Sequence, residues 1–146
     1  MSTTVPFATT ACVRDTCLCL HAQRAARALA RRFDDRLKPV GLTSGQFSLL
    51  MSLNRPEPAT MKSVAALLAM DRTTLTAALK VLERRGLSVV AVDPRDRRGR
   101  LLSLTDAGRD ALACAVPIWQ ATHADIEAGL DGLDPDALRA SLRRLG

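Results

Sequence analysis

Long apolar runs are missing from this sequence. No stretch approaches the roughly 20 consecutive apolar residues that a membrane-spanning helix needs, and the N-terminus shows no charged leader followed by an apolar segment. Hydrophobic residues make up 47% and charged residues 25% of the chain. These fractions are ordinary for a globular domain, so the chain can bury a core and need not be disordered, and a collagen-like or low-complexity chain is excluded. We therefore expect a single cytoplasmic domain without a membrane segment.

Metal-binding and catalytic patterns are scarce as well. The four cysteines form no C-x-x-C pair, and His21 and His123 lie far apart, which argues against a zinc site and a disulfide framework. Cys19 and His21, as nucleophile and base, would point about 200° apart on a helix. No glycine-rich phosphate loop is present. We expect no catalytic residue, no metal and no cofactor, and hence no enzyme.

Basic charge is concentrated in the middle of the chain. Residues 1–53 carry 7 basic and 3 acidic groups, residues 54–100 carry 10 and 5, and residues 101–146 carry 4 and 7. A basic middle and an acidic end indicate a polyanion-binding segment attached to a part with another role. The alternative interpretation is an ordinary solvated surface.

The N-terminal part predicts one long helix. Residues 1–13 are rich in Ser and Thr and show no hydrophobic period, so we expect a flexible arm there. From residue 14 to residue 37, apolar residues recur at three- and four-residue spacing, which is typical of one amphipathic helix. Pro39 and Gly41 then end this helix.

Start signals of three further helices follow. Thr43 and Gln46 form a capping box, and Thr60 and Asp71 are favourable N-cap residues. The expected helices cover residues 44–54, about 61–70, and 72–85.

The helix over residues 72–85 has an outward face that suits a DNA groove. Leu75, Ala78, Leu79 and Leu82 form its inward face, and Gly86 ends it. The outward residues are small, or long and polar, so the helix can approach base edges and phosphates closely. An ordinary surface helix is the alternative. The expected DNA-contacting residues are Arg72, Thr73, Thr74, Thr76, Ala77 and Lys80.

A hairpin with a cationic tip comes next. Val89–Val92 is a β-branched run, residues 93–99 read as a turn, and Arg100–Leu104 read as the returning strand. Asp93 and Asp96 either pair with the neighbouring arginines or form the turn. A narrow ribbon carrying guanidinium groups fits the minor groove of DNA. The arginines expected to do so are Arg95, Arg97, Arg98 and Arg100.

This order of elements predicts a mainly α fold with a small β-hairpin wing, a winged helix-turn-helix over residues 43–104. Residues 93–108, DPRDRRGRLLSLTDAG, resemble the wing and the following helix start of the multiple-antibiotic-resistance-regulator (MarR) family. Residues 41–47, GLTSGQF, and residues 82–87, LERRGL, also resemble segments of that family. The resemblance extends over roughly residues 14–145. A winged helix that contacts proteins instead of DNA is the alternative.

The resemblance implies a homodimeric transcriptional regulator, more often a repressor, that binds double-stranded DNA with a pseudo-palindromic operator. It places the dimerisation helices in residues 14–38 and 106–146 of a single domain over residues 14–146. Leu138, Leu142 and Leu145 support this independently, because such a thin apolar stripe on a last helix needs a partner. Packing within one chain is the alternative for this stripe.

The sequence leaves two alternatives for the signal that releases the regulator from DNA. The family commonly binds small aromatic anions in a cleft. The candidate residues for lining such a cleft in this chain are Trp119, His21, Arg24 and Met51. Each is at least as well explained as a core or interface residue.

The second signal is oxidation of a thiol. Cys19 falls where the organic-hydroperoxide-sensing branch of the family keeps its reactive cysteine, and a helix N-terminus with nearby Arg24 favours a thiolate. That branch surrounds the sulfur with tyrosines, whereas this chain has none. Structurally inert thiols and a soft-metal site are the alternatives. The candidate partners of Cys19 are Cys12, Cys17 and Cys114, of which Cys17 would lie about 200° from it on a continuous helix.

Overall fold

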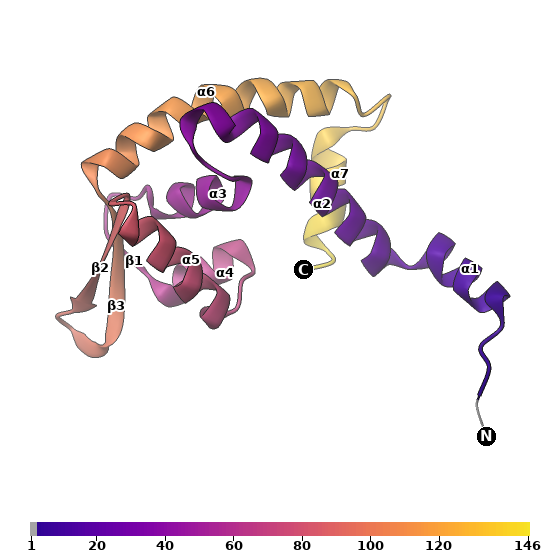
Figure 1. Cartoon of the computed structure of the whole chain (residues 1–146), viewed down its shortest axis with the longest axis horizontal. Coiled ribbons are helices and arrows are strands. Elements are labelled where there is room, and N and C mark those ends of the chain that lie inside the picture. Colours follow the sequence, from indigo (N-terminus) through magenta and orange to yellow (C-terminus); the bar gives the residue numbers. More distant parts are fainter. Residues whose placement is uncertain (1–2) are drawn as a thin grey trace.

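The computed structural model describes residues 3–146 and has a mainly helical fold with one small antiparallel sheet (Figure 1). None of the helices in this described part combines the length and apolar character needed to cross a bilayer. The elements are α1 (Phe7–Thr16), α2 (Leu18–Leu37), η1 (Lys38–Val40), α3 (Ser44–Leu53), β1 (Ala59–Thr60), α4 (Met61–Leu68), α5 (Arg72–Arg84), β2 (Ser88–Asp93), β3 (Asp96–Leu104), α6 (Asp106–Ala128) and α7 (Pro135–Arg143).

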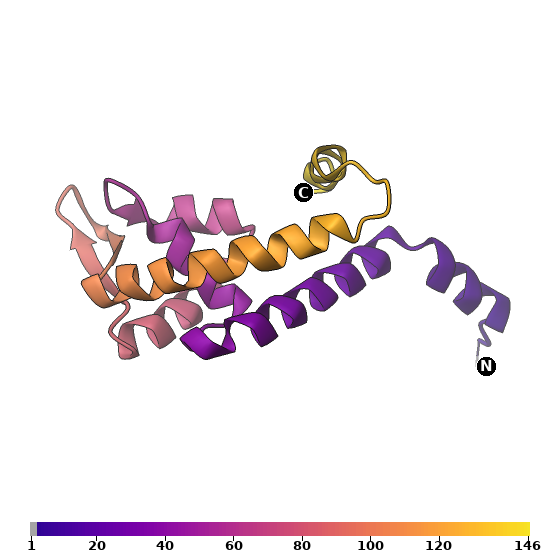
Figure 2. The same cartoon turned by 90° about the horizontal axis from the view of Figure 1, so that it is seen from above.

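The long helices α2 and α6 lie side by side, as both views show (Figures 1 and 2). An exposed ion pair joins them, with 3.5 Å between Arg36 Nη2 and Asp125 Oδ2. The winged helix, which comprises α3 to β3, lies below one end of this pair, and α1 extends beyond the other end (Figure 1). The region expected to bind DNA is therefore held at one end of a helical scaffold.

The N-terminal segment differs from the sequence prediction. A loose arm over residues 1–13 and a single helix from residue 14 were expected, but residues 7–16 form α1. The helix then breaks at Cys17, whose backbone is extended and whose sulfur accepts the N–H of Leu20 as the N-cap of α2. Because an N-cap residue has an extended backbone, the helix cannot continue through Cys17 while this residue caps α2. Residues 1 and 2 of the expected arm lie outside the described part.

The hydrophobic core joins the winged helix to α2 and α6. Leu37, Leu50, Leu75 and Leu102, from four different elements, are fully buried. On α5 the predicted inward face is confirmed, with Leu75, Leu79 and Leu82 buried and Ala78 half-buried against the core. Burying this face fixes which side of α5 is exposed.

The predicted caps are present. Thr43 and Gln46 form the expected capping box, in which the N–H of each residue donates to the side chain of the other at 3.1 and 3.2 Å. Thr60 and Asp71 cap α4 and α5. Gly86 after α5 has a φ of +70°, in the left-handed region that favours glycine.

The sheet is larger than predicted. Its strand order is β1-β3-β2, and the pairing of β1 with β3, which sets Ala59 opposite Leu102, was not expected. The hairpin turn is also tighter than the predicted turn over residues 93–99, because Asp93 pairs with Asp96 and leaves only Pro94 and Arg95 at the tip. Residues 97–99 of β3 form an irregularity in the ladder, between the pairs Asp93–Asp96 and Val92–Arg100.

Candidate nucleic-acid interface

The exposed face of α5 forms one continuous polar surface. It follows from the burial of Leu75, Leu79 and Leu82, because the remaining side of a helix must face outward. This surface is an open groove of about 460 Å³. Five of the six side chains expected there line it, namely Arg72, Thr73, Thr76, Ala77 and Lys80.

Thr74 is not brought into that groove. Its hydroxyl donates to Asp71 Oδ2 at 2.7 Å, and its backbone N–H donates to Oδ1 of the same carboxylate at 2.8 Å. These two bonds hold the pKa of Asp71 below its ordinary value, and the backbone N–H has the larger effect. Thr74 therefore belongs to the N-terminal cap of α5.

Thr76 combines a local bond with exposure to the groove. Its hydroxyl donates to the carbonyl oxygen of Arg72 at 2.8 Å. The hydroxyl hydrogen is thus occupied, while the oxygen lone pairs and the methyl group are available to a ligand in the groove.

The wing tip is shaped by its two aspartates. The N–H of Arg95 donates to Asp93 Oδ1 at 2.9 Å, and the N–H of Arg98 donates to Asp96 Oδ1 at 3.0 Å. Of the two roles left open for these carboxylates, the turn-forming one is the one observed. Each carboxylate fixes the backbone two residues further along the chain, as turn aspartates commonly do.

The arginines of the wing are all exposed. Arg100 Nη1 donates to the carbonyl oxygens of Arg97 and Gly99 at 3.2 and 3.0 Å and stiffens the bulge. Within residues 3–146, the guanidinium groups of Arg95, Arg97 and Arg98 form no hydrogen bond or ion pair. These three cations are free to contact an external anion.

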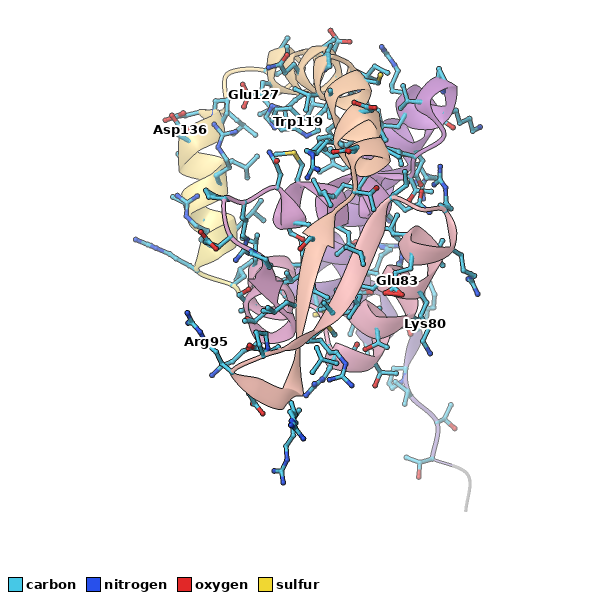
Figure 3. All side chains as sticks on the ribbon, turned by 90° about the vertical axis from the view of Figure 1, so that its left-hand side faces the viewer. Lys80, Glu83, Arg95, Trp119, Glu127 and Asp136 are labelled. Carbon is cyan, nitrogen blue, oxygen red and sulfur yellow. The ribbon has the colours of Figure 1, made fainter. Side chains whose placement is uncertain are left out.

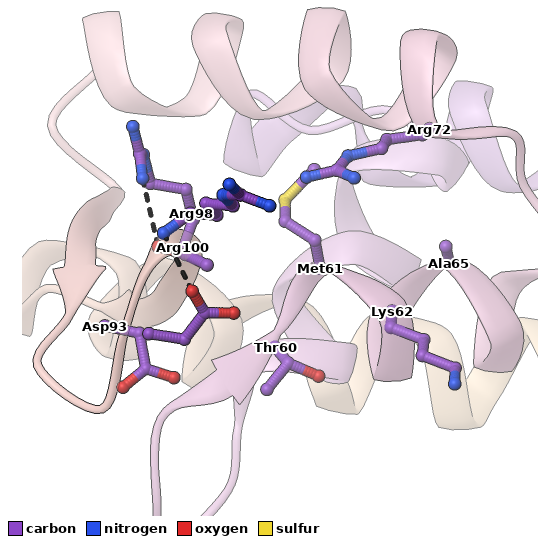
Figure 4. A pocket seen from close by; sticks show the side chains of 10 residues that line it. Thr60, Met61, Lys62, Ala65, Arg72, Asp93, Arg98 and Arg100 are labelled. Atoms are coloured by element: carbon purple, nitrogen blue, oxygen red, sulfur yellow. Dashed lines mark hydrogen bonds between the residues drawn. The ribbon is translucent and has the colours of Figure 1, made fainter.

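A cleft of about 590 Å³ connects the wing to the helices (Figure 4). It is bordered by Arg72 at the start of α5, by Lys62 on α4, and by Arg98 and Arg100 on β3. Arg72 thus borders both this cleft and the groove of α5. In Figure 3, Lys80 and Arg95 lie toward one end of the molecule, away from Trp119 on α6.

The predicted signal-sensing residues are not all brought together. Trp119 and Met51 line an apolar cavity of about 440 Å³ between α3, α4 and α6. His21 and Arg24 do not line it; the ring of His21 instead hydrogen-bonds the carbonyl oxygen of Cys17, with Nδ1 at 2.8 Å. The cavity residues that sequence reasoning missed are Phe47, Ser48, Ser52, Leu67, Leu68 and Val116.

Trp119 belongs to a series of contacting side chains that leads from α3 along α6 to α7. Its ring stacks on Phe47 of α3, with centroids 6.2 Å apart, and on His123, with centroids 4.9 Å apart. His123 Nδ1 lies 3.5 Å from Glu127 Oε1, which also accepts a hydrogen bond from Arg139 of α7 at 2.6 Å. The cavity wall is therefore linked through side chains to the last helix.

All four cysteines are free thiols. The premise that Cys17 and Cys19 share one helix is wrong, because Cys17 precedes α2. The amide Nε2 of Gln23 donates to Cys19 Sγ at 3.3 Å. Cys12 lies in α1 and Cys114 in α6. Residues 3–146 contain no cluster of three His, Cys, Asp or Glu side chains suited to a metal ion.

Comparison with known proteins assigns this geometry to one group. A model of the MarR family matches residues 40–99. The crystal structure of the transcriptional regulator MosR of M. tuberculosis in complex with DNA is similar, with a TM-score of 0.82 and 38% identity over 89% of this chain and 93% of MosR.

Two curated relatives are similar over shorter stretches. HTH-type transcriptional regulator SarZ of Staphylococcus epidermidis is 29% identical over 64% of this chain and 63% of SarZ. The organic hydroperoxide resistance transcriptional regulator of Bacillus subtilis is 31% identical over 62% of each chain. The chain therefore spans slightly less than two thirds of the length of these relatives.

Proposed function

The chain belongs to the MarR family of DNA-binding transcriptional regulators, and we propose that it acts as a homodimer that binds a pseudo-palindromic operator and thereby represses transcription. The two recognition helices α5 of such a dimer would enter successive major grooves about 34 Å apart. An inverted repeat follows from the two-fold axis of the dimer.

The observation that carries this proposal is the position of Arg72, which borders both the groove of α5 and the cleft under the wing. A DNA duplex on this face would meet Thr73, Thr76 and Lys80 in its major groove. The free guanidinium groups of the wing would meet the adjacent minor groove, where the negative potential is high.

Dimerisation is supported by apolar side chains that a single chain leaves exposed. Leu138 and Leu142 on α7 are 38% and 53% exposed, and Leu18 on α2 is 70% exposed. Helices α2 and α7 come from the two ends of the chain, where the family resemblance places the dimer interface. A second copy would remove these side chains from water.

Release from DNA is proposed to follow binding of a small aromatic molecule in the cavity beside Trp119. The cavity lies between the winged helix and α6, so an occupant would favour one arrangement of α3 relative to α6. Both recognition helices would move with that arrangement, which shifts the population between DNA-binding and released dimers.

Thiol sensing is the second candidate. It is favoured by the similarity to the Bacillus subtilis regulator named for organic hydroperoxide resistance. Cys19 is exposed and lies in the first turn of α2, where a peroxide can reach its thiol.

One titration tests DNA binding by the dimer and the thiol switch. Light scattering would first measure the mass of the purified protein. The protein would then be added to a labelled inverted-repeat duplex from its own upstream DNA, first reduced and then treated with cumene hydroperoxide. We expect tight, salt-sensitive binding of the reduced dimer; a monomer, or equal affinity for random DNA, would overturn the main proposal. The thiol switch would be established if oxidation abolishes DNA binding by the unsubstituted protein and by Cys114→Ser but leaves DNA binding by Cys19→Ser unchanged.

A further inference from the structure

The groove of α5 carries small side chains between two cations. Arg72 and Lys80 line its two ends and are eight residues apart on the helix, which corresponds to about 12 Å along the helix axis. Thr73, Thr76 and Ala77 line the groove between them. The middle of this surface is therefore small and partly apolar, whereas both ends are positively charged.

The hydroxyl groups of the two groove threonines differ in what they are bonded to. The Thr76 hydroxyl donates to the carbonyl oxygen of Arg72 in its own helix, at 2.8 Å. Its methyl group and its oxygen lone pairs remain for a ligand. The Thr73 hydroxyl has no hydrogen-bond partner within residues 3–146, so it can donate to a phosphate or a base. Ala77 adds a second methyl group next to Thr76, and these two methyl groups are the apolar contact that the groove offers.

Strong hydrogen-bond acceptors are absent from the described wall of the groove. Arginine and lysine side chains only donate, and none of the lining residues carries an amide or a carboxylate. The carboxylate of Asp71 is bonded to Thr74, and Glu83 lines the neighbouring cavity between α5 and the sheet. Adenine and cytosine present amino groups in the major groove, which Asn, Gln, Asp and Glu side chains accept. Neither base would meet such a side chain on this face of α5.

Thymine is the base whose exposed edge matches the middle of the groove. In the major groove it presents the O4 acceptor and the C5 methyl group, and it presents no donor. We propose that the methyl groups of Thr76 and Ala77 pack against the C5 methyl group of a thymine in each half of the operator. The proposal rests on the proposed function, because it names the base that the recognition helix reads. It makes Thr76 a specificity-determining residue through its methyl group and not through its hydroxyl.

Replacement of thymine by deoxyuridine tests this contact, because it removes the C5 methyl group and leaves base pairing intact. The inverted-repeat duplex from the protein's own upstream DNA would be prepared with each thymine replaced singly, and anisotropy would measure the affinity of the full-length protein for each duplex. At one or more symmetry-related positions of the two half-sites, we expect the affinity to fall about fourfold, the effect of exposing one buried methyl group. Unchanged affinity at every position would overturn the proposal.

Two variants separate the methyl group of Thr76 from its hydroxyl. Thr76→Ser keeps the hydroxyl and loses the methyl group, so the effect of deoxyuridine at the sensitive position should shrink to about twofold, the part that Ala77 still supplies. Thr76→Val keeps a methyl group and loses the hydroxyl, and it should retain the full effect. The reverse pattern would assign the contact to the hydroxyl oxygen and would overturn the proposal.

Thr74→Ser is the matched control for these variants. It makes the same chemical change one turn earlier on α5, at a side chain that is bonded to Asp71 and does not line the groove. The full effect of deoxyuridine should persist in this variant. A smaller effect in Thr74→Ser would contradict the placement of the thymine against Thr76.

Failure of this inference is distinguishable from failure of the proposed function. A protein that binds the inverted-repeat duplex in a salt-sensitive way, but binds every deoxyuridine duplex equally well, refutes only the inference. A protein that does not distinguish the inverted repeat from a random duplex refutes the proposed function and the inference with it.

Discussion

Arg85 Nη1 donates a hydrogen bond to Gln46 Oε1 over 3.1 Å and so ties the C-terminal end of α5 to the first turn of α3. The same oxygen of Gln46 accepts the backbone N–H of Thr43 in the capping box. One side chain therefore serves two purposes, because it completes the cap of α3 and holds the recognition helix against it. The amide N–H of Ser44 donates in addition to Asp34 Oδ1 at 2.6 Å, which links the same turn to α2.

We predict that Gln46→Ala lowers the free energy of unfolding by about 1 kcal/mol, because it removes half of the capping box and the partner of Arg85. Urea unfolding followed by circular dichroism measures this. Gln46→Glu keeps an acceptor for both donors and is the matched control, for which we expect stability close to that of the unsubstituted protein. An equal loss in both variants would show that neither hydrogen bond stabilises the fold.

Arg97→Ala should weaken binding to specific and random duplexes by a similar factor. The Arg97 guanidinium has no partner within residues 3–146, so its substitution removes a cation from the surface proposed to face DNA without breaking a contact in the wing. If it contacts one phosphate, the slope of log affinity against log salt should become shallower by about 0.9. Anisotropy titrations at several salt concentrations measure the slope. Arg143→Ala on α7 is the control; the same change there would mean that net charge alone is responsible.

Thr76→Ala should change the preference among DNA sequences. Thr76 lines the groove of α5 and its hydroxyl donates to the carbonyl oxygen of Arg72, so its oxygen lone pairs and methyl group remain for a base-edge contact, which would discriminate by about 1–3 kcal/mol. Affinities for a panel of operators with single base-pair changes would reveal the altered position. Thr74→Ala is the control, since its hydroxyl is bound to Asp71; a changed base preference in that variant would refute the division of roles between the two threonines.

The stability of the fold should decline in acid partly through Asp71. Its pKa is lowered from an ordinary value of 3.8 by the N–H and the hydroxyl of Thr74. A carboxyl with a lowered folded-state pKa contributes stability above its unfolded pKa and loses it as the pH falls through the folded value. Asp71→Asn keeps an N-cap acceptor but cannot titrate, so its unfolding free energy should fall less between pH 5 and pH 2 than that of the unsubstituted protein. Parallel pH profiles of the two proteins would contradict this assignment.

The features that the sequence predicts are those set by neighbouring residues. The caps at Thr43 and Asp71 and the left-handed Gly86 depend on contacts within a few positions, so they were visible from residue types and spacing. The pairing of β1 with β3 joins segments far apart in the chain and involves only two residues of β1, too few for a recognisable period.

The candidate site divides in the same way. The surface proposed to face DNA could be outlined from the sequence because its side chains follow one another on α5 and on the wing. The cavity was not, because Phe47, Leu67 and Trp119 come from three helices and meet only through tertiary packing. The break at Cys17 was missed for a different reason: it is a local feature, but the apolar spacing continues across it and a thiol is not a residue type that predicts an N-cap.

Leu142→Glu should convert the dimer into a monomer. Leu142 is 53% exposed on the apolar stripe of α7, and a buried, unpaired carboxylate at a dimer interface is strongly unfavourable. The variant should keep its helical circular dichroism signal, because this side chain packs little within one chain, while light scattering reports half the mass. Its affinity for the inverted repeat should fall by at least about tenfold, because the two half-sites are no longer bound by linked recognition helices. Ala140→Glu places the same charge about 200° around α7 from Leu142 and should remain dimeric. Dissociation of both variants, or of neither, would show that the leucine stripe is not the dimer interface. Dissociation of Leu142→Glu alone would place α7 in that interface.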